Sequence, residues 1–392
     1  MVADQSVSMS ECPLHVVLIS SSDPLDVHSF SGSIFYMAKA LQAEFPQIEI
    51  VRASRAFWFE PLQRVLLKLS KGRIDPYYWR PLNRLFAARL AKRWRNKRVV
   101  VIAVVNSALV GQLAARVPVI NVSDSTYDLM RTEHEVFWSL GSGAAARAEE
   151  DEANSIRRSV HSSFSSHWAA NSAIQHYGAS PDDVSVISWG CNFETVPASE
   201  VREEPFAQEE CRLMFIGGEW ERKGGDIVCE AARLLSAKGM KVRVDAVGAP
   251  PPDGQVFPAE FQYHGYLSKA DPEHAMRLRG LMRDAELLFL PTRRDCTPMV
   301  FAEANAYGTP ALTRGVGGVA DVVHDGANGI VLPEHASTAD FASAIETLWK
   351  GRSRYAALRR SARAEYDNRL NWSVWARGIG DQVRRLAAEG RI

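Results

Sequence analysis

Two acidic residues at a fixed spacing lie beside a segment that could bind an anion. Asp295 follows an apolar run that ends at Pro291, and Glu303 comes eight residues later. Pro298, between the two acids, is well placed to open a helix, because its fixed φ suits a first turn whose free amides favour an anionic group. A carboxylate accepts two hydroxyl hydrogen bonds well. We therefore expect Asp295 at the reacting end of a ligand and Glu303 on its vicinal diol; two solvated surface acids are the plainer alternative.

Two adjacent cations form a second candidate site. After a strand-like run that ends in two glycines, Arg222 and Lys223 stand just before an expected helix that starts at Gly224. Cations at a helix N-terminus oppose the macrodipole and are poor choices for stability alone. They suit a bound diphosphate, for which lysine is a point charge and arginine a planar fork. A solvated basic turn remains the alternative.

The elements that must position these residues alternate between short apolar runs and longer amphipathic ones. This alternation indicates an α/β fold with parallel sheets, because parallel pairing needs helical crossovers. The expected strands cover 15–20, 48–51, 99–105, 118–122, 184–188, 212–218, 242–247, 261–263 and 285–291. The expected helices include 31–45, 145–161, 224–237 and 371–390.

The amino-acid composition of the chain changes near its middle. Residues 193–210 are polar, acidic and interrupted by prolines, which suits a linker between domains. We therefore predict an N-terminal domain over 1–197, a linker over 198–210 and a C-terminal domain over 211–370, both domains doubly wound, with their ligand edges across a common cleft. A C-terminal helix over 371–392 either crosses back onto the first domain or stays in the second.

Composition places the chain among globular proteins. Its 392 residues suffice for two to three domains of about 150 residues. With 46% hydrophobic and 23% charged residues it is neither disordered, collagen-like nor a coiled coil. The 46 basic and 46 acidic residues cancel, which disfavours a chain-wide polyanion binder. The absence of a membrane-length apolar stretch, of a signal segment and of paired cysteines favours a cytoplasmic protein without a structural metal.

The segment around the two acids resembles the donor motif of the family 4 retaining glycosyltransferases, a GT-B group. That motif pairs two acids eight positions apart with a following glycine-threonine-proline turn, and it stands here as Asp295-x7-Glu303 and 308–310. The runs 317–323 and 326–333 are also similar to this family. The resemblance implies a GT-B fold of two Rossmann-like domains. It implies that Glu303 binds the ribose of a nucleotide sugar, and that Asp295, a glutamate in the family, lies against the transferred sugar.

The resemblance implies further roles around these acids. Lys223 matches the lysine of the family's phosphate clamp, and Arg222 substitutes for the arginine that the family has at Gly218. Helix-start amides are expected on the diphosphate, the backbone after residue 265 on the nucleobase, and a glycine loop of the first domain near the phosphates. The implied catalytic residues are Asp295, Lys223, Arg222 and the acceptor-side Asp124. The implied donor-binding residues are Glu303, Thr297, Pro298, Met299, Val300, Gly218, Tyr266, Leu267 and Gly32.

These roles imply a retaining, metal-independent transfer of a sugar from a UDP- or GDP-linked donor to a glycan or lipid-linked acceptor. No DxD-like pair stands at a donor loop, so cations of the protein are expected to replace a metal ion, and no cofactor is expected beyond the nucleotide sugar. Two alternatives remain. One is a non-catalytic nucleotide-sugar-binding or scaffold protein, which Asp295 and a missing acceptor-side histidine would favour. The other is a different GT-B enzyme, such as an epimerase or a phosphorylase.

A basic, aromatic segment lies between Arg52 and Arg98. It holds 14 lysines or arginines and two acids, with eight aromatic residues among them. Such a segment can lie on the inner face of an anionic membrane or bind a lipid-linked acceptor. It can equally be a solvated basic face over core aromatics. Nucleic-acid binding has no supporting motif, and we expect no nucleic-acid partner.

Overall fold

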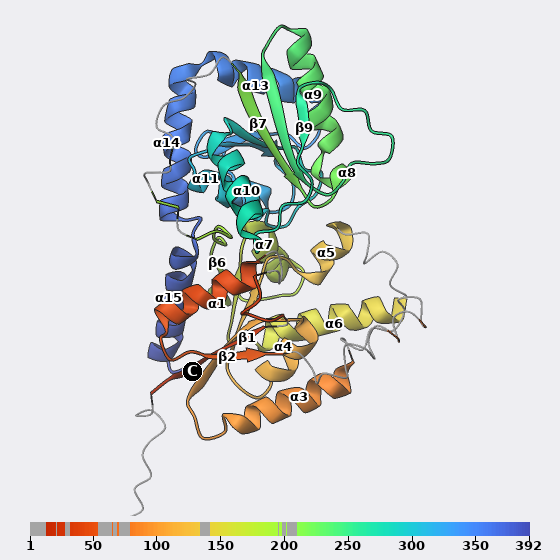
Figure 1. Cartoon of the computed structure of the whole chain (residues 1–392). Coiled ribbons are helices and arrows are strands. Elements are labelled where there is room, and N and C mark those ends of the chain that lie inside the picture. Colours follow the sequence, from red (N-terminus) through yellow and green to blue (C-terminus); the bar gives the residue numbers. More distant parts are fainter. Residues whose placement is uncertain are drawn as a thin grey trace, which may run out of the picture. The chain divides into compact units, whose positions relative to one another are not determined.

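The computed structural model contains two α/β units (Figure 1). It describes residues 13–20, 22–27, 32–53, 65, 69, 79–133, 142–194, 196–197, 201 and 210–392. The first unit comprises 1–187 and 376–392, and the second comprises 188–375. The division therefore falls ahead of the polar segment in which we expected the linker. Most of that linker, 198–200 and 202–209, lies outside the described residues, as do the aromatic residues at 57–59, 77 and 78.

The first unit is built on a six-stranded sheet whose described pairs are all parallel, in the order β2-β1-β3-β4-β5-β6. Its central strand β3 has the sequence VVVIAV and is buried along its whole length, as a parallel strand covered by helices on both faces must be. Leu18 pairs with Ile50 on one side and Ile102 on the other. The strands are β1 (His15–Ser20), β2 (Glu49–Arg52), β3 (Val99–Val104), β4 (Val119–Ser123), β5 (His161–Phe164) and β6 (Val184–Val186).

Helices cover this sheet through apolar faces at helical spacing. In α1, Ile34, Met37 and Leu41 recur every three or four residues and are buried. The Asn106 side chain caps α4 by accepting a hydrogen bond from the Leu109 amide at 2.9 Å. The helices are α1 (Ser33–Glu44), α3 (Arg80–Arg93), α4 (Ser107–Ala114), α5 (Tyr127–Glu133), α6 (Ser142–Arg158), α7 (His167–Gln175) and the 3₁₀ turn η5 (Pro181–Asp183).

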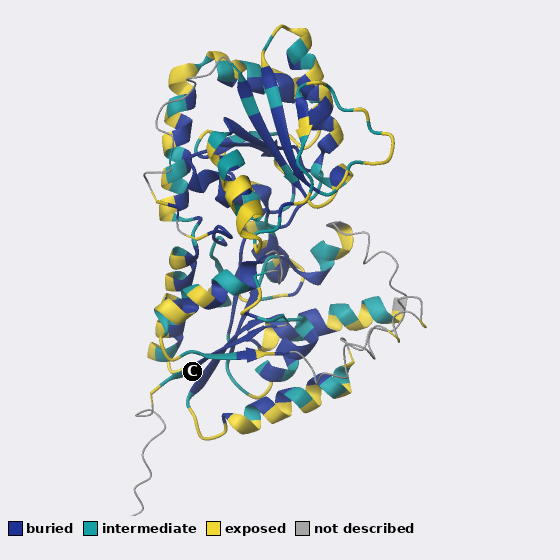
Figure 2. Cartoon of the chain, in the orientation of Figure 1, coloured by how far each residue is buried: buried dark blue, intermediate teal, exposed yellow. Residues whose placement is uncertain are grey.

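The second unit repeats the plan with a parallel sheet in the order β12-β11-β10-β7-β8-β9. Its strands are the buried layer in Figure 2, while the outer helix faces are exposed. The strands are β7 (Cys211–Gly217), β8 (Val242–Gly248), β9 (Phe261–Tyr263), β10 (Leu287–Leu290), β11 (Ala311–Arg314) and β12 (Gly329–Leu332).

The helices of the second unit begin at well-formed caps. Ser337 and Asp340 form a reciprocal capping box at the start of α13, and Asp271 caps α10 by accepting from the amides of Glu273 and His274. The helices are α8 (Trp220–Lys223), α9 (Gly225–Ala237), α10 (Pro272–Asp284), α11 (Met299–Ala306), α12 (Val319–Val322), α13 (Thr338–Lys350) and α14 (Arg352–Asn368).

The last helix, α15 (Trp372–Ala388), begins in the second unit and continues into the first. At its start the Trp372 indole donates to Asn192 at 3.1 Å. From Ala376 onward the chain groups with the first unit, where Arg384 pairs with Glu44 at 2.8 Å. Beyond the helix, Arg391 pairs with Asp183 at 2.7 Å. These contacts attach the end of the chain to the first sheet and its helices.

The expected fold class, α/β with two doubly wound parallel sheets, is confirmed. The strand expected over 261–263 is β9 without change, and the strand expected over 99–105 ends one residue earlier. Within the described ranges, every helix is too short or too polar to cross a membrane.

A buried carboxyl group in α6 leads to a prediction about stability. Glu152 is 7% exposed and accepts a hydrogen bond from the Ser107 hydroxyl at 2.5 Å. Burial raises the pKa of Glu152 from 4.5 to about 7, with the Ser107 bond acting in the opposite direction. The folded state therefore prefers the neutral acid. The associated stability is present below pH 4.5 and is lost as the pH rises through 7.

Glu152→Gln keeps the hydrogen bond and removes the titration. We expect the free energy of unfolding of Glu152→Gln, relative to that of the wild type, to increase by about 3 kcal/mol between pH 4.5 and pH 8. Urea unfolding across this pH range measures the difference, with the exposed Asp182→Asn in the same unit as the control. A difference between Glu152→Gln and wild type that stays constant with pH would contradict the assignment.

Candidate functional site

In the second sheet, the direction in which successive strands are added reverses at β7. The predicted donor residues lie at this point. The first strand of the sheet, β7, lies between β8 and β10. The chain builds β8 and β9 on one side of β7 before it builds β10, β11 and β12 on the other. Crossovers that leave in opposite directions open a crevice outside the carboxyl ends of the two central strands, where α/β sheets bind ligands. Arg222 and Lys223 follow β7, and Asp295 follows β10.

Close backbone packing brings these two segments together. Gly224 has a φ of +81°, and a Cβ there would lie 2.5 Å from the Pro291 carbonyl oxygen. A Cβ at Gly225 would lie 2.5 Å from the Trp220 ring. Only glycine fits both positions, so the turn between α8 and α9 can lie directly against the end of β10. The preceding residue, Lys223, is thereby held beside the loop that follows β10.

Lys223 and Asp295 form an ion pair across 72 residues of sequence. Their side chains are only 12% and 10% exposed. The hydroxyl of Thr292 lies 3.5 Å from the same Asp295 oxygen that Lys223 contacts. The structure thus brings together the predicted phosphate-binding cation and the predicted sugar-side acid. A diphosphate that binds Lys223 must compete with the Asp295 carboxylate for it.

Arg222 binds the loop that carries Asp295 and also adds positive charge to the site. Its guanidinium donates to the Arg294 carbonyl at 2.9 Å and to Glu219 at 2.8 Å, and it lies 3.9 Å from Asp295. Burial lowers the pKa of Arg222, but the hydrogen bond to Glu219 and the charge of Asp295 outweigh burial and raise it. Arg222 is therefore a cation in the site whose hydrogen bonds position the backbone before Asp295.

A second arginine clamp, which the sequence did not reveal, fixes the same loop. Arg293 makes two hydrogen bonds to the Asp226 carboxylate, at 2.9 and 2.6 Å. Its amide also donates to the Arg222 carbonyl at 2.8 Å. Asp226 lies in the first turn of α9, so this clamp ties the loop to the helix that follows Lys223.

The helix expected after Asp295 is present as α11. Pro298 is its N-cap residue, with φ −73° and ψ 101°, and Met299 and Val300 are its first two residues. The first amides of a helix have no partner within the helix, and here they directly follow the loop that carries Asp295. Thr297 lies in this loop just before the helix. The anion-binding start that the sequence predicts for α11 would therefore lie next to Asp295.

Glu303 is buried inside α11 and is paired with a lysine from another loop. Glu303 is 1% exposed, and its carboxylate forms an ion pair with Lys269, whose side chain is 23% exposed. The Lys269 ammonium also lies 4.7 Å from the centre of the Phe193 ring. Sequence reasoning did not assign Lys269 to the site, because 34 residues with no motif spacing separate it from Glu303.

Lys269 belongs to the loop that was expected to contact the nucleobase. That loop follows β9 and starts at Gly265, which has a φ of +73°. Tyr266 is 73% exposed, whereas Leu267 is 6% exposed and packs into the core. The exposed ring and the buried anchor suit a loop that presents its backbone to a ligand. Gly218, directly after β7, is exposed, and a Cβ added there would meet no atom within 4 Å.

Two predicted residues belong to the first unit. Gly32 is the N-cap of α1 and has a φ of +93°. Asp124 directly follows β4. Both lie after the carboxyl ends of their strands, β1 and β4, and therefore at the ligand-binding edge of the first sheet. All the other predicted site residues belong to the second unit.

Gly317 supports the position of Asp295 through close backbone contact. Its φ is +51°, and a Cβ there would lie 2.1 Å from the Asp295 carbonyl oxygen, which accepts a hydrogen bond from Gly318 at 3.1 Å. Gly317→Ala must therefore displace the Asp295 backbone. For the nucleotide site that the sequence predicts, we expect binding to weaken at least tenfold, since shifts of about 1 Å in a site have effects of this order.

Gly326→Ala is the matched control, because Gly326 also has a positive φ, +75°, but nothing lies within 4 Å of its Cβ position. It should lose about 1 kcal/mol of stability from backbone strain and keep its affinity. Nucleotide titration by calorimetry measures both variants. Equal nucleotide affinities of the two variants would show that the contact of Gly317 with Asp295 does not affect binding.

Much of the second unit matches a family of known proteins. Residues 210–351 match the family model for glycosyl transferases group 1. The chain is 28% identical over 225 residues to D-inositol 3-phosphate glycosyltransferase of Rhodococcus opacus, covering 54% of this chain and 50% of that protein. It is 31% identical over 194 residues to the protein of that name from Geodermatophilus obscurus, covering 46% and 43%. The chain thus spans about half the length of these curated relatives.

Solved structures share the fold over nearly the whole chain. Anabaena Alr3699/HepE in complex with UDP has a TM-score of 0.65 at 14% identity, covering 95% of this chain and all of that one. Sucrose-phosphate synthase from Thermosynechococcus elongatus has a TM-score of 0.68 at 14% identity, covering 96% of this chain and all of that one. Residues 210–351 are therefore similar to the glycosyl transferases group 1 family, and the two α/β units have the GT-B fold of these solved structures.

Proposed function

We propose that this protein transfers a sugar from a nucleotide-sugar donor to a glycan or lipid-linked acceptor, with retention at the anomeric carbon and without a metal ion. The observation that carries the proposal is the meeting of Lys223 with Asp295 at the sheet's switch point, next to the start of α11. This places a cation, a carboxylate and helix-start amides together, as a nucleoside diphosphate with an attached sugar requires.

The chemistry follows from where charge develops. As the glycosidic bond to the diphosphate breaks, negative charge grows on the phosphate and positive character grows on the sugar. Lys223 and the first amides of α11 would stabilise the growing phosphate charge, and the Asp295 carboxylate would lie near the sugar. Preorganised charge of this kind is commonly the largest contribution to catalysis. In this proposal, Lys223 and Arg222 do the work that a metal ion does in other enzymes.

Glu303 would accept hydrogen bonds from the ribose hydroxyls. These bonds would form either beside its ion pair with Lys269 or in place of it. A solved neighbour of the same fold is described in complex with UDP-glucose, which supports a uridine nucleotide as the first donor to test. Curated relatives are named for D-inositol 3-phosphate, which makes this phosphorylated polyol the first soluble acceptor to test.

The first experiment is a thermal-shift assay of the wild type and Glu303→Gln with UDP, GDP, ADP and their common sugar conjugates. A ligand at 100 times its Kd adds about 2.7 kcal/mol to the free energy of unfolding, which raises the melting temperature by several degrees. We expect a shift with one base, reduced in Glu303→Gln. No shift with any nucleotide would oppose the proposed donor site.

A product assay then separates an enzyme from a nucleotide-sugar-binding scaffold. With the donor that produces a shift, glycosyl transfer should release nucleoside diphosphate and give a product with the donor's anomeric configuration, read by NMR. Excess EDTA should leave the rate unchanged. Nucleotide binding without product for any acceptor would favour the scaffold, and an inverted product or a rate abolished by EDTA would contradict the retaining, metal-independent mechanism.

A further inference from the structure

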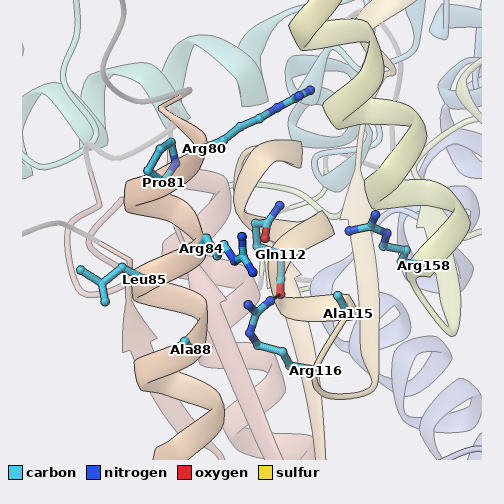
Figure 3. Close-up of a pocket in the computed structure, with 9 residues that line it drawn as sticks. All are labelled: Arg80, Pro81, Arg84, Leu85, Ala88, Gln112, Ala115, Arg116 and Arg158. Atoms are coloured by element: carbon cyan, nitrogen blue, oxygen red, sulfur yellow. Dashed lines mark hydrogen bonds between the residues drawn. The ribbon is translucent and has the colours of Figure 1, made fainter.

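A cationic pocket lies in the first unit, among the helices on one side of its sheet. Its volume is about 810 Å³. The walls come from the first half of α3, the end of α4 and the last residue of α6, helices that pack in the order α3-α4-α6. Figure 3 shows the side chains of Arg84 and Arg116 extending toward Gln112 in the middle of the pocket, with Arg158 reaching in from α6.

Three of the four arginines that line this pocket have no acidic partner within the described ranges. Arg84, Arg116 and Arg158 are exposed and form no ion pair with any carboxylate in the described part of the chain. Arg116 donates to the Gln112 carbonyl at 2.6 Å, and Arg158 donates to the Gly111 carbonyl at 3.2 Å. Three guanidinium groups thus share one pocket, although arginines on a merely solvated surface usually lie among acids of opposite sign.

A fourth arginine builds the wall of the pocket. Arg80 pairs with Asp151 at 2.8 Å and with Glu150 at 2.9 Å. The Asp151 side chain is only 5% exposed, so this pair anchors the start of α3 onto α6. The pocket therefore lies beside helices that this ion pair ties together, and Arg84 lies one helical turn after Arg80.

The exposed side of α3 adds apolar surface to this charge. The helix contains five basic residues and no acid. Leu85 is 53% exposed, and Trp79, the N-cap of the same helix, is 59% exposed. Large apolar side chains next to unpaired cations are typical of surfaces that contact the headgroup region of a lipid layer.

We propose that this pocket is a second anion site, which binds a phosphate group through Arg84, Arg116 and Arg158. Guanidinium groups form paired hydrogen bonds to phosphate oxygens, and three of them can surround one phosphate. The site lies in the first unit, whereas Arg222 and Lys223, the cations proposed for the donor phosphates, lie in the second. The phosphate can belong to an anionic lipid or to a soluble compound, and the exposed Trp79 and Leu85 favour the lipid.

The test compares Arg84→Gln/Arg116→Gln with a charge-matched control in the full chain. The control is Arg354→Gln/Arg360→Gln, which removes two exposed arginines of α14 that pair with no described acid. The first arm is co-sedimentation with phosphatidylglycerol–phosphatidylcholine vesicles at ~0.1 M salt, where screening of surface charge is still moderate, against phosphatidylcholine alone. The second arm is calorimetric titration with inorganic phosphate. Phosphate bound at the donor site is common to both variants, so only the difference between them reports the pocket.

For the lipid, we expect the pocket variant to bind about 25-fold more weakly than the control, since each basic residue near an anionic surface contributes about fivefold. A loss confined to the phosphate titration would instead assign the site to a soluble ligand. Equal binding by the two double variants in both arms would overturn the proposal. Arg158→Gln provides an independent check, with an expected loss of about fivefold, and thermal melts establish that each variant is folded.

Discussion

Lys223→Gln is expected to lower kcat/KM for glycosyl transfer by about 100- to 1000-fold, the loss typical of removing one preorganised donor from a developing oxyanion. Lys223 lies against the loop that leads into α11, where its ammonium pairs with Asp295. Its side chain is 12% exposed and is directed onto Asp295 by the close contact of Gly224 with Pro291. Neither water nor a flexible neighbour can readily replace a charge that is fixed in this way.

The ion pair with Asp295 makes the origin of this loss testable. Lys223→Gln also leaves Asp295, 10% exposed, without its cation, which costs stability as well as rate. Lys223→Gln/Asp295→Asn removes both charges, so we expect stability to recover while the rate stays low. Steady-state kinetics and urea unfolding on the same samples separate the two effects.

Lys238→Gln is the control for Lys223→Gln. Lys238 forms an exposed pair with Glu346 on the surface of the same unit, so its loss should leave the rate unchanged. A Lys223→Gln enzyme with turnover close to that of the wild type would show that the leaving phosphate does not depend on this lysine.

Removal of Lys269 and removal of Glu303, which form an ion pair, should lower the free energy of unfolding by unequal amounts. Lys269→Met leaves a carboxylate that is 1% exposed without a counter-charge, and breaking a buried pair in this way costs about 3–5 kcal/mol of unfolding free energy. Glu303→Gln leaves a lysine that is 23% exposed and can reach water, so its cost is expected to be about 1 kcal/mol. Urea unfolding of both variants measures this difference.

The double variant Lys269→Met/Glu303→Gln shows whether the unequal costs come from an uncompensated charge. We expect it to be more stable than Lys269→Met alone, because the buried carboxylate is then absent. Its nucleotide affinity should match that of Glu303→Gln, since the ribose partner is missing in both. Equal destabilisation by Lys269→Met and Glu303→Gln would mean that burial of the carboxylate does not set the cost.

Local pattern alone was enough to predict the fold class and to single out two segments of the candidate site. Short apolar runs alternating with amphipathic ones predicted both parallel sheets, because the periodicity of a segment reflects which faces it must bury. The spacing of Asp295 and Glu303 and the glycine-rich turn after Lys223 pointed to these two candidate segments for the same reason. Each is a contiguous stretch whose residue types constrain its own backbone.

The tertiary structure decided which of these stretches meet and what each charge contacts. Lys223 pairs with Asp295 across 72 residues and Lys269 pairs with Glu303 across 34 residues, and neither pairing leaves a spacing that a sequence could reveal. The first pairing depends on strand order, which places β7 beside β10. The cationic pocket arises likewise, because arginines from α3, from the turn after α4 and from α6 converge only when those helices pack on one another. Charges far apart along the chain are brought together by the packing of apolar faces, and that packing is a property of the whole fold.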